Sequence, residues 1–309
     1  MKRKIVAFLI LGLMFLLVII INLDMEMREG ENTHSKVDID YDKKQYVPWG
    51  VNLIGNIKGA NSKVVKVAIL DSGIEKAHPD LEGKVVKEFN ATDPDNPSRD
   101  VLGHGTAVAG IITANDNDRG ILGVTQNVEI YSVKVIKDDG KIDREHFLNG
   151  LAWAISQNVD VINLSLGFQK NFPELQKLVE TAINKGIIVV AASGNAHGMN
   201  SQYPARYHKV ISVGAVDKNL KPTNFTATGK VDFVAPGVDI LSINRNGYSH
   251  FDGTSFSVGY ITGIVAEILS RESINKNEKI VSDVKEQLEK MSSKSEINKS
   301  VGHGVPKFK

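Results

Sequence analysis

The chain has 309 residues, of which 42% are hydrophobic and 24% are charged, and these proportions are typical of a globular protein. The 37 basic residues nearly balance the 36 acidic ones, so the formal net charge of +1 gives no reason to expect a nucleic-acid partner. The sequence contains no cysteine, which excludes disulfide bonds and thiolate metal sites.

The N-terminus is basic at positions 2–4 and continues with an uncharged, largely apolar segment from Ile5 to Leu23. A helix of about 19 residues is roughly 28 Å long, which is close to the thickness of the hydrocarbon core of a bilayer. Secretory signal segments are usually shorter and end in a small-x-small cleavage site, whereas this segment ends without one. We therefore predict that residues 1–23 form an uncleaved transmembrane helix.

The basic end of such an anchor stays in the cytoplasm, which places the rest of the chain outside a bacterial cell membrane. The alternative is a long signal peptide that is cleaved, followed by secretion. Residues 24–43 are polar and charged without an apolar period, and we interpret them as a linker.

From residue 44 to residue 309, short β-branched runs alternate with stretches of helical pattern. The predicted strands are Val64–Leu70, Ile130–Val135, Val159–Leu164, Ile187–Ala191 and Val210–Val216, and the predicted helices are 104–114, 143–157, 173–185, 254–270 and 279–291. The strand-like runs are apolar on successive residues, as in strands buried on both faces. The pattern predicts one α/β domain over 44–309, with a doubly wound, mostly parallel sheet and helices on both faces.

Three motifs carry chemically useful side chains at strand ends or helix starts, where α/β sheets place their active sites. Asp71 follows a buried strand, His104 stands between two glycines at a helix start, and Ser255 stands at the start of another helix. Each residue alone has a simpler explanation: a turn aspartate, a packed or surface histidine, and a helix N-cap serine. Together they supply an orienting carboxylate, a base and a nucleophile.

The order Asp, His, Ser in these motifs resembles that of the subtilisin-like serine proteases, the subtilases. The resemblance covers most of residues 44–272. Further matching motifs are Pro48-Trp49-Gly50, His78-Pro79-Asp80-Leu81, Tyr131–Val135, Trp153-Ala154-Ile155, Asp160–Gly167, Ala192–Asn195 and Val234–Gly237. The resemblance implies a serine endopeptidase that acts through an acyl-enzyme, with Asp71, His104 and Ser255 as its catalytic triad and Asn195 as a donor in the oxyanion hole.

The resemblance also implies where a polypeptide substrate binds. An extended substrate is expected between two edges, and side chains of the same region are expected to border the P1 and P4 pockets. The edges are Gly140-Lys141-Ile142 and Ser165-Leu166-Gly167, Gln202 matches the bottom of the P1 pocket, and Arg144 and Phe147 match the P4 pocket. A glutamine at the bottom of the pocket predicts a weaker preference for large aromatic P1 side chains, and the arginine predicts tolerance of acidic P4 residues.

A structural Ca²⁺ site is implied by the same resemblance, because members of the family hold the ion with oxygen ligands from three segments. The corresponding side chains are Gln45, Asp80 and Asn117, and the corresponding carbonyl groups belong to Asn115, Arg119 and Ile121. The alternative is that residues 115–118 form an ordinary polar turn.

Two features depart from the family pattern. Only about 20 residues separate the predicted anchor from the domain, where secreted relatives carry a folding prodomain of many tens of residues. The segment Phe256–Tyr260 stands where relatives often have Met-Ala-Ser-Pro-His.

Two other functions stay open beside a general endopeptidase. They are a dedicated maturation protease for an exported peptide and an inactive subtilase fold used as a binding module. An esterase of the α/β-hydrolase type is disfavoured, since the Gly-x-Ser-x-Gly motif is missing around Ser255 and the order of the three residues differs. We expect a monomer.

Overall fold

In the computed structural model, which describes residues 36–37, 44–55, 63–272, 276–277, 279–292 and 301–308, the centre of the fold is a parallel sheet. Its seven described strands lie in the order β3-β4-β2-β5-β6-β7-β8, and every neighbouring pair is parallel. They are β2 (Val65–Asp71), β3 (Val85–Asn90), β4 (Val128–Lys134), β5 (Val161–Leu164), β6 (Ile188–Ala192), β7 (Ile211–Val216) and β8 (Phe233–Pro236).

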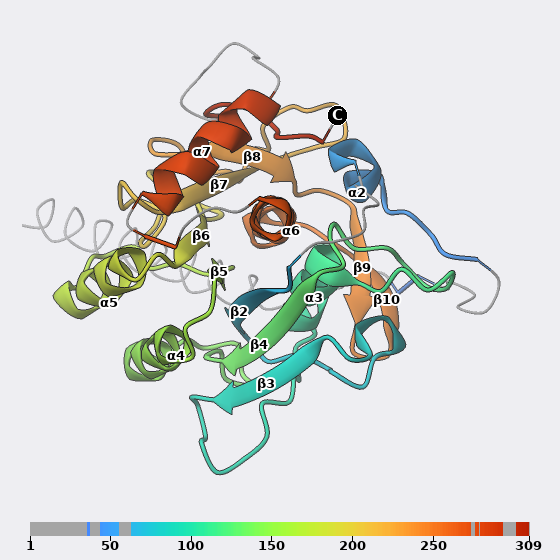
Figure 1. Cartoon of the computed structure of the whole chain (residues 1–309), viewed down its shortest axis with the longest axis horizontal. Coiled ribbons are helices and arrows are strands. Elements are labelled where there is room, and N and C mark those ends of the chain that lie inside the picture. Colours follow the sequence, from blue (N-terminus) through green and yellow to red (C-terminus); the bar gives the residue numbers. More distant parts are fainter. Residues whose placement is uncertain are drawn as a thin grey trace, which may run out of the picture. The chain divides into compact units, whose positions relative to one another are not determined.

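Helices cover both faces of this sheet (Figure 1). On one face α6 (Thr254–Arg271) crosses β5 to β8 and packs beside α3 (His104–Thr113). On the other face lie α4 (Arg144–Ser156) and α5 (Pro173–Asn184). The predicted doubly wound, mostly parallel α/β architecture is therefore confirmed.

Three further helical segments surround the sheet. They are α2 (Trp49–Ile54), the 3₁₀ turn η1 (Pro79–Leu81) and α7 (Ile280–Met291). Helix α7 lies beside β7 and β8 in Figure 1, and its Lys285 donates a hydrogen bond to Asp232, next to the start of β8.

A second, antiparallel sheet was not predicted from the sequence. It consists of β1 (Lys36–Val37), β10 (Gly247–Phe251) and β9 (Ile240–Asn244), in that order. β10 leads directly into the turn before α6, so this small sheet holds the start of the helix that carries Ser255.

The strand order reverses at β2, and this reversal locates the site. From β2 the chain passes to the edge strand β3 and returns to β4, which lies between them, and it then continues to β5 and the following strands on the other side of β2. The crevice at the carboxyl end of such a strand is where α/β proteins bind ligands. Asp71 is the last residue of β2, and β2 is almost wholly buried because sheet neighbours and helices surround it.

Within the part of the chain that the structure describes, no helix is both long and apolar enough to cross a membrane. The predicted anchor over 1–23 lies outside the described residues, and of the predicted linker over 24–43 only 36–37 are described.

Candidate active site

The carboxylate of Asp71 and the imidazole of His104 form a short contact. Nδ1 of His104 lies 2.7 Å from Oδ1 of Asp71, and Oδ1 also accepts a hydrogen bond of 2.7 Å from the backbone N–H of Ser72. Asp71 is 1% exposed, whereas the imidazole is 27% exposed. The ring is therefore held by a buried carboxylate on one nitrogen while part of it faces solvent.

A glycine after the histidine makes this contact possible. A Cβ atom on Gly105 would overlap the carbonyl oxygen of Gly73 and lie 2.9 Å from Cβ of Asp71. The first turn of α3 therefore sits directly against the end of β2, and only glycine fits between them. The sequence shows a glycine on each side of His104, and this packing explains the second of them.

The surroundings of His104 favour its charged form. Burial of the ring opposes protonation, but the negative charge of Asp71, its hydrogen bond to the ring and the charge of Asp100 together raise the pKa of His104 above its usual value. A general base must accept a proton during the reaction, so this environment suits an imidazole in that role.

Ser255 lies in the first turn of α6, and this turn approaches the imidazole through the side chain of the following residue. The ring of the next residue, Phe256, is 5.1 Å from the ring of His104, measured between centroids. The Ser255 hydroxyl donates a 2.9 Å hydrogen bond to the backbone carbonyl of Ser165, whose own hydroxyl donates to the Ser255 carbonyl at 3.1 Å. The hydroxyl must leave the Ser165 carbonyl before it can donate to the histidine.

Asn195 is oriented by the residue before the serine. Its Oδ1 accepts hydrogen bonds from the backbone N–H of Thr254 at 3.1 Å and from the Thr254 hydroxyl at 3.0 Å. Because Oδ1 is occupied, Nδ2 is the end of the amide that remains to donate. A Cβ atom on Gly253 would lie 3.4 Å from Nδ2, and Asn195 is exposed to solvent. The amide thus stands at the start of α6 as an accessible donor.

The structure places Gln202 against the edge formed by Ser165-Leu166-Gly167. Its backbone N–H donates to the carbonyl of Ser193 at 2.9 Å. Its side chain packs between two glycines. A Cβ atom added to Gly167 would lie 2.7 Å from Oε1 of Gln202, and one added to Gly194 would lie 2.7 Å from its Cδ. The glutamine therefore fills space between the segment before the Asn195 amide and the predicted substrate edge.

The other predicted edge is the end of a tight hairpin. The backbone N–H of Lys137 donates to the carbonyl of Lys141 at 3.0 Å, and Ile142 pairs with Ile136 in an antiparallel bridge. Gly140 adopts a φ of +80° at the turn, a conformation that glycine tolerates best.

The residues predicted for the P4 pocket lie on and beside α4. Phe147 is fully buried and packs edge-on against Phe168, with 5.0 Å between ring centroids. Arg144 stacks over Phe172 at 4.3 Å and forms an ion pair with Glu174. The charge that was expected to attract acidic P4 residues is thus already paired with a carboxylate.

Four of the six predicted calcium ligands come together around the η1 turn. Nε2 of Gln45 donates to the carbonyls of Asn115 at 2.6 Å and Ile121 at 3.4 Å, and the backbone N–H of Ile121 donates to Oδ2 of Asp80 at 3.0 Å. The other two, Asn117 and Arg119, lie in the exposed turn that follows, where Asn117 accepts from the Arg119 N–H.

These residues fit a cation. Oδ1 of Asp80 is buried without a hydrogen-bond partner among the described residues, and burial raises the pKa of Asp80 to about 6. A half-turn of the Gln45 amide would direct its oxygen toward the same space as the two carbonyl groups. Within the described ranges no cluster of three or more His, Cys, Asp or Glu side chains occurs, and this candidate uses a single carboxylate with neutral oxygens.

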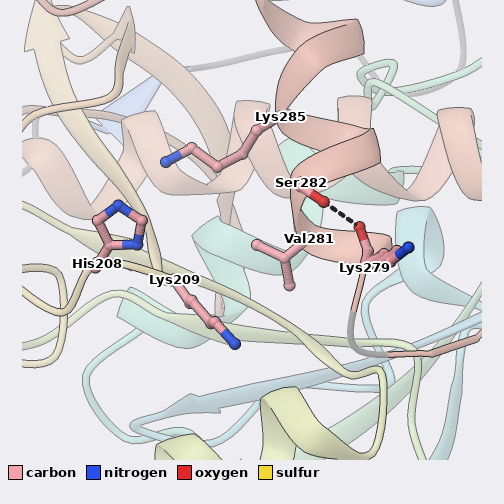
Figure 2. A pocket seen from close by; sticks show the side chains of 6 residues that line it. All are labelled: His208, Lys209, Lys279, Val281, Ser282 and Lys285. Carbon is pink, nitrogen blue, oxygen red and sulfur yellow. Dashed lines mark hydrogen bonds between the residues drawn. The ribbon is translucent and has the colours of Figure 1, made fainter.

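Two hollows on the protein lie apart from these residues. One, of about 380 Å³, is lined by His208, Lys209, Lys279, Val281, Ser282 and Lys285, and a neighbouring one of about 450 Å³ shares His208 and Lys209. Figure 2 shows that the three lysine side chains of the first hollow point in different directions, and Lys285 is bonded to Asp232. Their ammonium groups do not converge on one point, so this hollow is not a built anion site.

The fold and these contacts define a class: an α/β protein with a carboxylate–imidazole pair at the switch point of a parallel sheet and a serine at the start of the helix α6. Comparison with known proteins gives the family. The model of the subtilase family, a class of S8 peptidases, matches residues 62–304. The chain therefore belongs to the subtilase family, which is a family of serine-type endopeptidases.

Several curated relatives are similar over most of the domain. Subtilisin amylosacchariticus of Bacillus subtilis subsp. amylosacchariticus is 39% identical over 243 residues, which are 75% of this chain and 64% of that protein. Subtilisin DY of Bacillus licheniformis is 40% identical over 240 residues, which are 74% of this chain and 86% of that protein. The major intracellular serine protease of Bacillus subtilis (strain 168) is 39% identical over 70% of this chain and 71% of its own length. The chain thus spans less than two thirds of the first of these relatives.

The sequence interpretation missed the polar residues behind Asp71 and His104. Ser72 and Asp100 are buried and hydrogen-bonded to each other, and the buried Lys134 donates to the Ser72 carbonyl at 2.6 Å. Their only sequence signal was proximity, since Asp100 stands four residues before the histidine and Ser72 directly follows the aspartate.

Proposed function

We propose that this protein is a serine endopeptidase that hydrolyses peptide bonds through an acyl-enzyme intermediate. The observation that carries the proposal is the 2.7 Å contact between His104 and Asp71, with the ring beside the helix start that bears Ser255. Membership of the subtilase family supports the same chemistry.

In the proposed first step, Oγ of Ser255 attacks the carbonyl carbon of the substrate while Nε2 of His104 takes the hydroxyl proton. The bond to the leaving nitrogen then breaks, and His104 donates the proton to the departing amine. Water repeats the sequence on the acyl ester and releases the second product. Asp71 holds the ring by Nδ1 and stabilises the imidazolium, which agrees with the raised pKa of His104.

The oxyanion that forms in each half of the reaction needs donors that are already in place. We assign Nδ2 of Asn195 and the backbone N–H of Ser255 to this task. Thr254 fixes the amide by both of its donors, and N–H groups in the first turn of a helix lack intrahelical acceptors. The start of α6 therefore supplies the nucleophile and part of the oxyanion site together.

Substrate is proposed to bind as an extended strand along Ser165-Leu166-Gly167. The carbonyl of Ser165, which now accepts the Ser255 hydroxyl, is one acceptor on that edge. A peptide N–H that takes this acceptor would release the hydroxyl toward His104, so binding of the substrate would complete the catalytic arrangement.

A calcium ion held by Gln45, Asp80 and the carbonyls of Asn115 and Ile121 is proposed to have a structural role. The ion would supply the positive charge that the buried Asp80 carboxylate needs. It would join the segment before α2 to η1 and to the loop after α3, at the opposite end of α3 from His104.

The sequence of residues 1–23 supports attachment of the enzyme to a bacterial membrane with the peptidase domain outside, and we propose that it acts there as a monomer. Digestion of intact cells with an added protease tests this placement, because an external domain is degraded without lysis.

A narrower function, maturation of one exported peptide, is favoured by one observation. The Gln202 side chain fills the space between Gly167 and Gly194, where the resemblance to subtilases places the bottom of the P1 pocket, so a large P1 side chain would find little room. A library of peptides distinguishes the two, since a general endopeptidase cleaves many members and a maturation enzyme few.

The test of the proposed activity is labelling of the full chain, purified in detergent, by a fluorophosphonate probe. We expect the unmodified protein to label and the Ser255→Ala variant to remain unlabelled, and cleavage of a casein substrate to follow the same pattern. Absence of both labelling and cleavage in a chain shown to be folded by circular dichroism would overturn the proposal in favour of an inactive binding module.

A further inference from the structure

A buried carboxylate that the proposed reaction does not use lies four residues before His104. Asp100 is fully buried in the loop between β3 and α3. An ionised carboxylate in this position is unfavourable unless hydrogen bonds or positive charges compensate it. The groups that do so belong to the parts of the chain that carry the catalytic pair.

The first set of donors is the start of α3. Oδ1 of Asp100 accepts from the backbone N–H groups of Gly103 at 2.8 Å and Leu102 at 3.1 Å, and Oδ2 accepts from the backbone N–H of Thr106 at 3.0 Å and its hydroxyl at 2.5 Å. These residues flank His104 on both sides. The carboxylate therefore fixes the backbone from which the imidazole projects.

The second link runs to the end of β2 through Ser72. Oγ of Ser72 lies 2.8 Å from Oδ1 of Asp100 and 3.2 Å from Oδ1 of Asp71, so the hydroxyl stands between the two carboxylates and donates chiefly to Asp100. The same oxygen accepts from the backbone N–H of Gly105 at 3.0 Å. One hydroxyl thus joins the strand that carries Asp71 to the helix that carries His104.

Negative charge predominates around the imidazole of His104. Asp71 and Asp100 are both buried on its side of the site, whereas Lys134 on β4 reaches the Ser72 carbonyl and also pairs with Asp138. Arg245, in the turn between β9 and β10, donates to the carbonyl of Val101 at 3.0 Å. Protonation of His104 adds a positive charge next to two buried carboxylates, and the charge of Asp100 supports the effect of Asp71 on its pKa.

We propose that Asp100 is a positioning residue for catalysis, which holds the imidazole of His104 against Asp71 through Ser72 and the first turn of α3. The inference rests on the proposed function. If Asp100 only stabilised its own loop, it would change neither the position nor the pKa of the His104 ring. As a positioning residue it affects both.

The test uses the full chain in detergent with the variant Asp100→Asn, which keeps the size of the side chain. Both carboxylate oxygens of Asp100 accept hydrogen bonds, so in either orientation of the amide its N–H₂ group faces a hydrogen-bond donor instead of accepting from it. Ser72→Ala cuts the bridge and keeps both carboxylates. Asp95→Asn is the matched control, because it removes an equal charge from an exposed position in the same loop.

Two readouts are measured on each variant. One is the pH profile of kcat and of kcat/KM on a peptide. The other is the titration of the His104 ring by NMR with labelled histidine in a Ser255→Ala background, in which the signal is assigned by its loss in His104→Gln. The titration needs no activity, so it remains informative if the proposed peptidase reaction fails.

We expect Asp100→Asn to lower kcat by about 10²-fold, as a small misplacement of a catalytic group does, with little change in KM. The pKa of His104 should fall, and the acid limb of kcat/KM should move to lower pH. Ser72→Ala should lower kcat less and move the titration less, and Asp95→Asn should match the unmodified chain.

An Asp100→Asn variant that folds with an unchanged His104 titration and unchanged kcat would overturn the proposal. If this variant does not fold, the Ser72→Ala variant provides the test. A folded Ser72→Ala chain with unchanged kcat and an unchanged His104 titration would show that the Ser72 hydroxyl does not connect Asp100 to the catalytic pair. Failure of the unmodified chain to label or cleave contradicts the proposed function instead, while the titration still reports on Asp100.

Discussion

Two aspartates of this protein are alike in burial and differ in what surrounds them. Asp71 and Asp80 are both almost wholly inaccessible, and each has one carboxylate oxygen without a hydrogen-bond partner among the described residues. Asp71 contacts the imidazole of His104 and the N–H and hydroxyl of Ser72. Asp80 contacts a backbone N–H and the hydroxyl of Tyr248, which are both neutral.

This difference is what we expect between the proposed catalytic site at Asp71 and the proposed ion site at Asp80. At Asp71 the charge is met by a group of the protein that can itself take up a proton, so the pair can work in proton transfer. At Asp80 carbonyl oxygens lie nearby and burial raises the pKa to about 6, so the carboxylate lacks a compensating charge. A buried carboxylate among neutral oxygens is what a bound cation would stabilise.

The largest expected effect is on the Asp71 side. Asp71→Asn should lower kcat by about 10⁴-fold, because an amide can hold the ring in the wrong tautomer and does not stabilise the imidazolium. The melting temperature should change far less than the rate. Steady-state kinetics on a peptide substrate measure the first quantity and calorimetry the second. A variant that retains a tenth of the activity would show that Asp71 does not orient His104.

A smaller loss is expected at the oxyanion donor. Asn195→Ala should lower kcat by about 10²–10³-fold, as loss of one such donor does in comparable enzymes, and KM should hardly change because the donor acts on the transition state. Asn195→Asp, which is similar in size but cannot donate, should behave in the same way. A raised KM with an unchanged kcat would instead place the amide in ground-state binding.

The Asp80 side should govern stability. In the folded chain the pKa of Asp80 is about 6, above its usual value of 3.8, so the metal-free folded chain binds more protons than the unfolded chain between these two values. Its stability should therefore fall as the pH rises from about 4 to about 7, by at most about 3 kcal/mol. Calcium favours the ionised carboxylate and should reverse this trend. Thermal unfolding in chelator and in calcium, at pH 5 and pH 8, measures both effects.

The control for that experiment is Asp80→Asn, which removes the titrating group and the single charged ligand. Without metal, the stability of this variant should no longer fall toward pH 8. Calcium at about a hundred times its Kd should stabilise the unmodified chain by about 2.7 kcal/mol. The same calcium concentration should hardly stabilise the variant. If calcium stabilises the variant as strongly as the unmodified chain, the ion binds elsewhere.

The sequence predicted the fold well where strands are buried on both faces. Apolar runs identified β2 and β4 to β7, because helices and neighbouring strands cover both sides of these strands. The edge strand β3 was missed, since the charged residues Lys87, which is exposed, and Glu88, which is partly buried, interrupt its apolar pattern. β9 and β10 were missed because both are short and carry buried serines in place of an apolar run.

The candidate site was predictable in its residues and not in its contacts. Asp71, His104 and Ser255 stand in short motifs that a single sequence shows. The partner of the Ser255 hydroxyl is the Ser165 carbonyl, ninety positions away, and the neighbour of Arg144 is Glu174 on another helix. Such contacts depend on how distant segments meet in space, which local patterns do not encode.

The smallest effect is expected at Gln202, which should influence the choice of substrate without affecting the Asp71 site or the Asp80 site. Gln202→Ala should open the space between Gly167 and Gly194 and raise kcat/KM for a peptide with phenylalanine at P1 by about tenfold relative to one with alanine, a typical gain for added apolar room. Among the described residues, no hydrogen bond joins the Gln202 side chain to Asp71 or to the Asp80 site, so the rate of fluorophosphonate labelling and the response of stability to calcium should stay as they are. An unchanged P1 preference would mean that the glutamine lies outside the pocket, and a loss of labelling would mean that it supports the start of α6 instead.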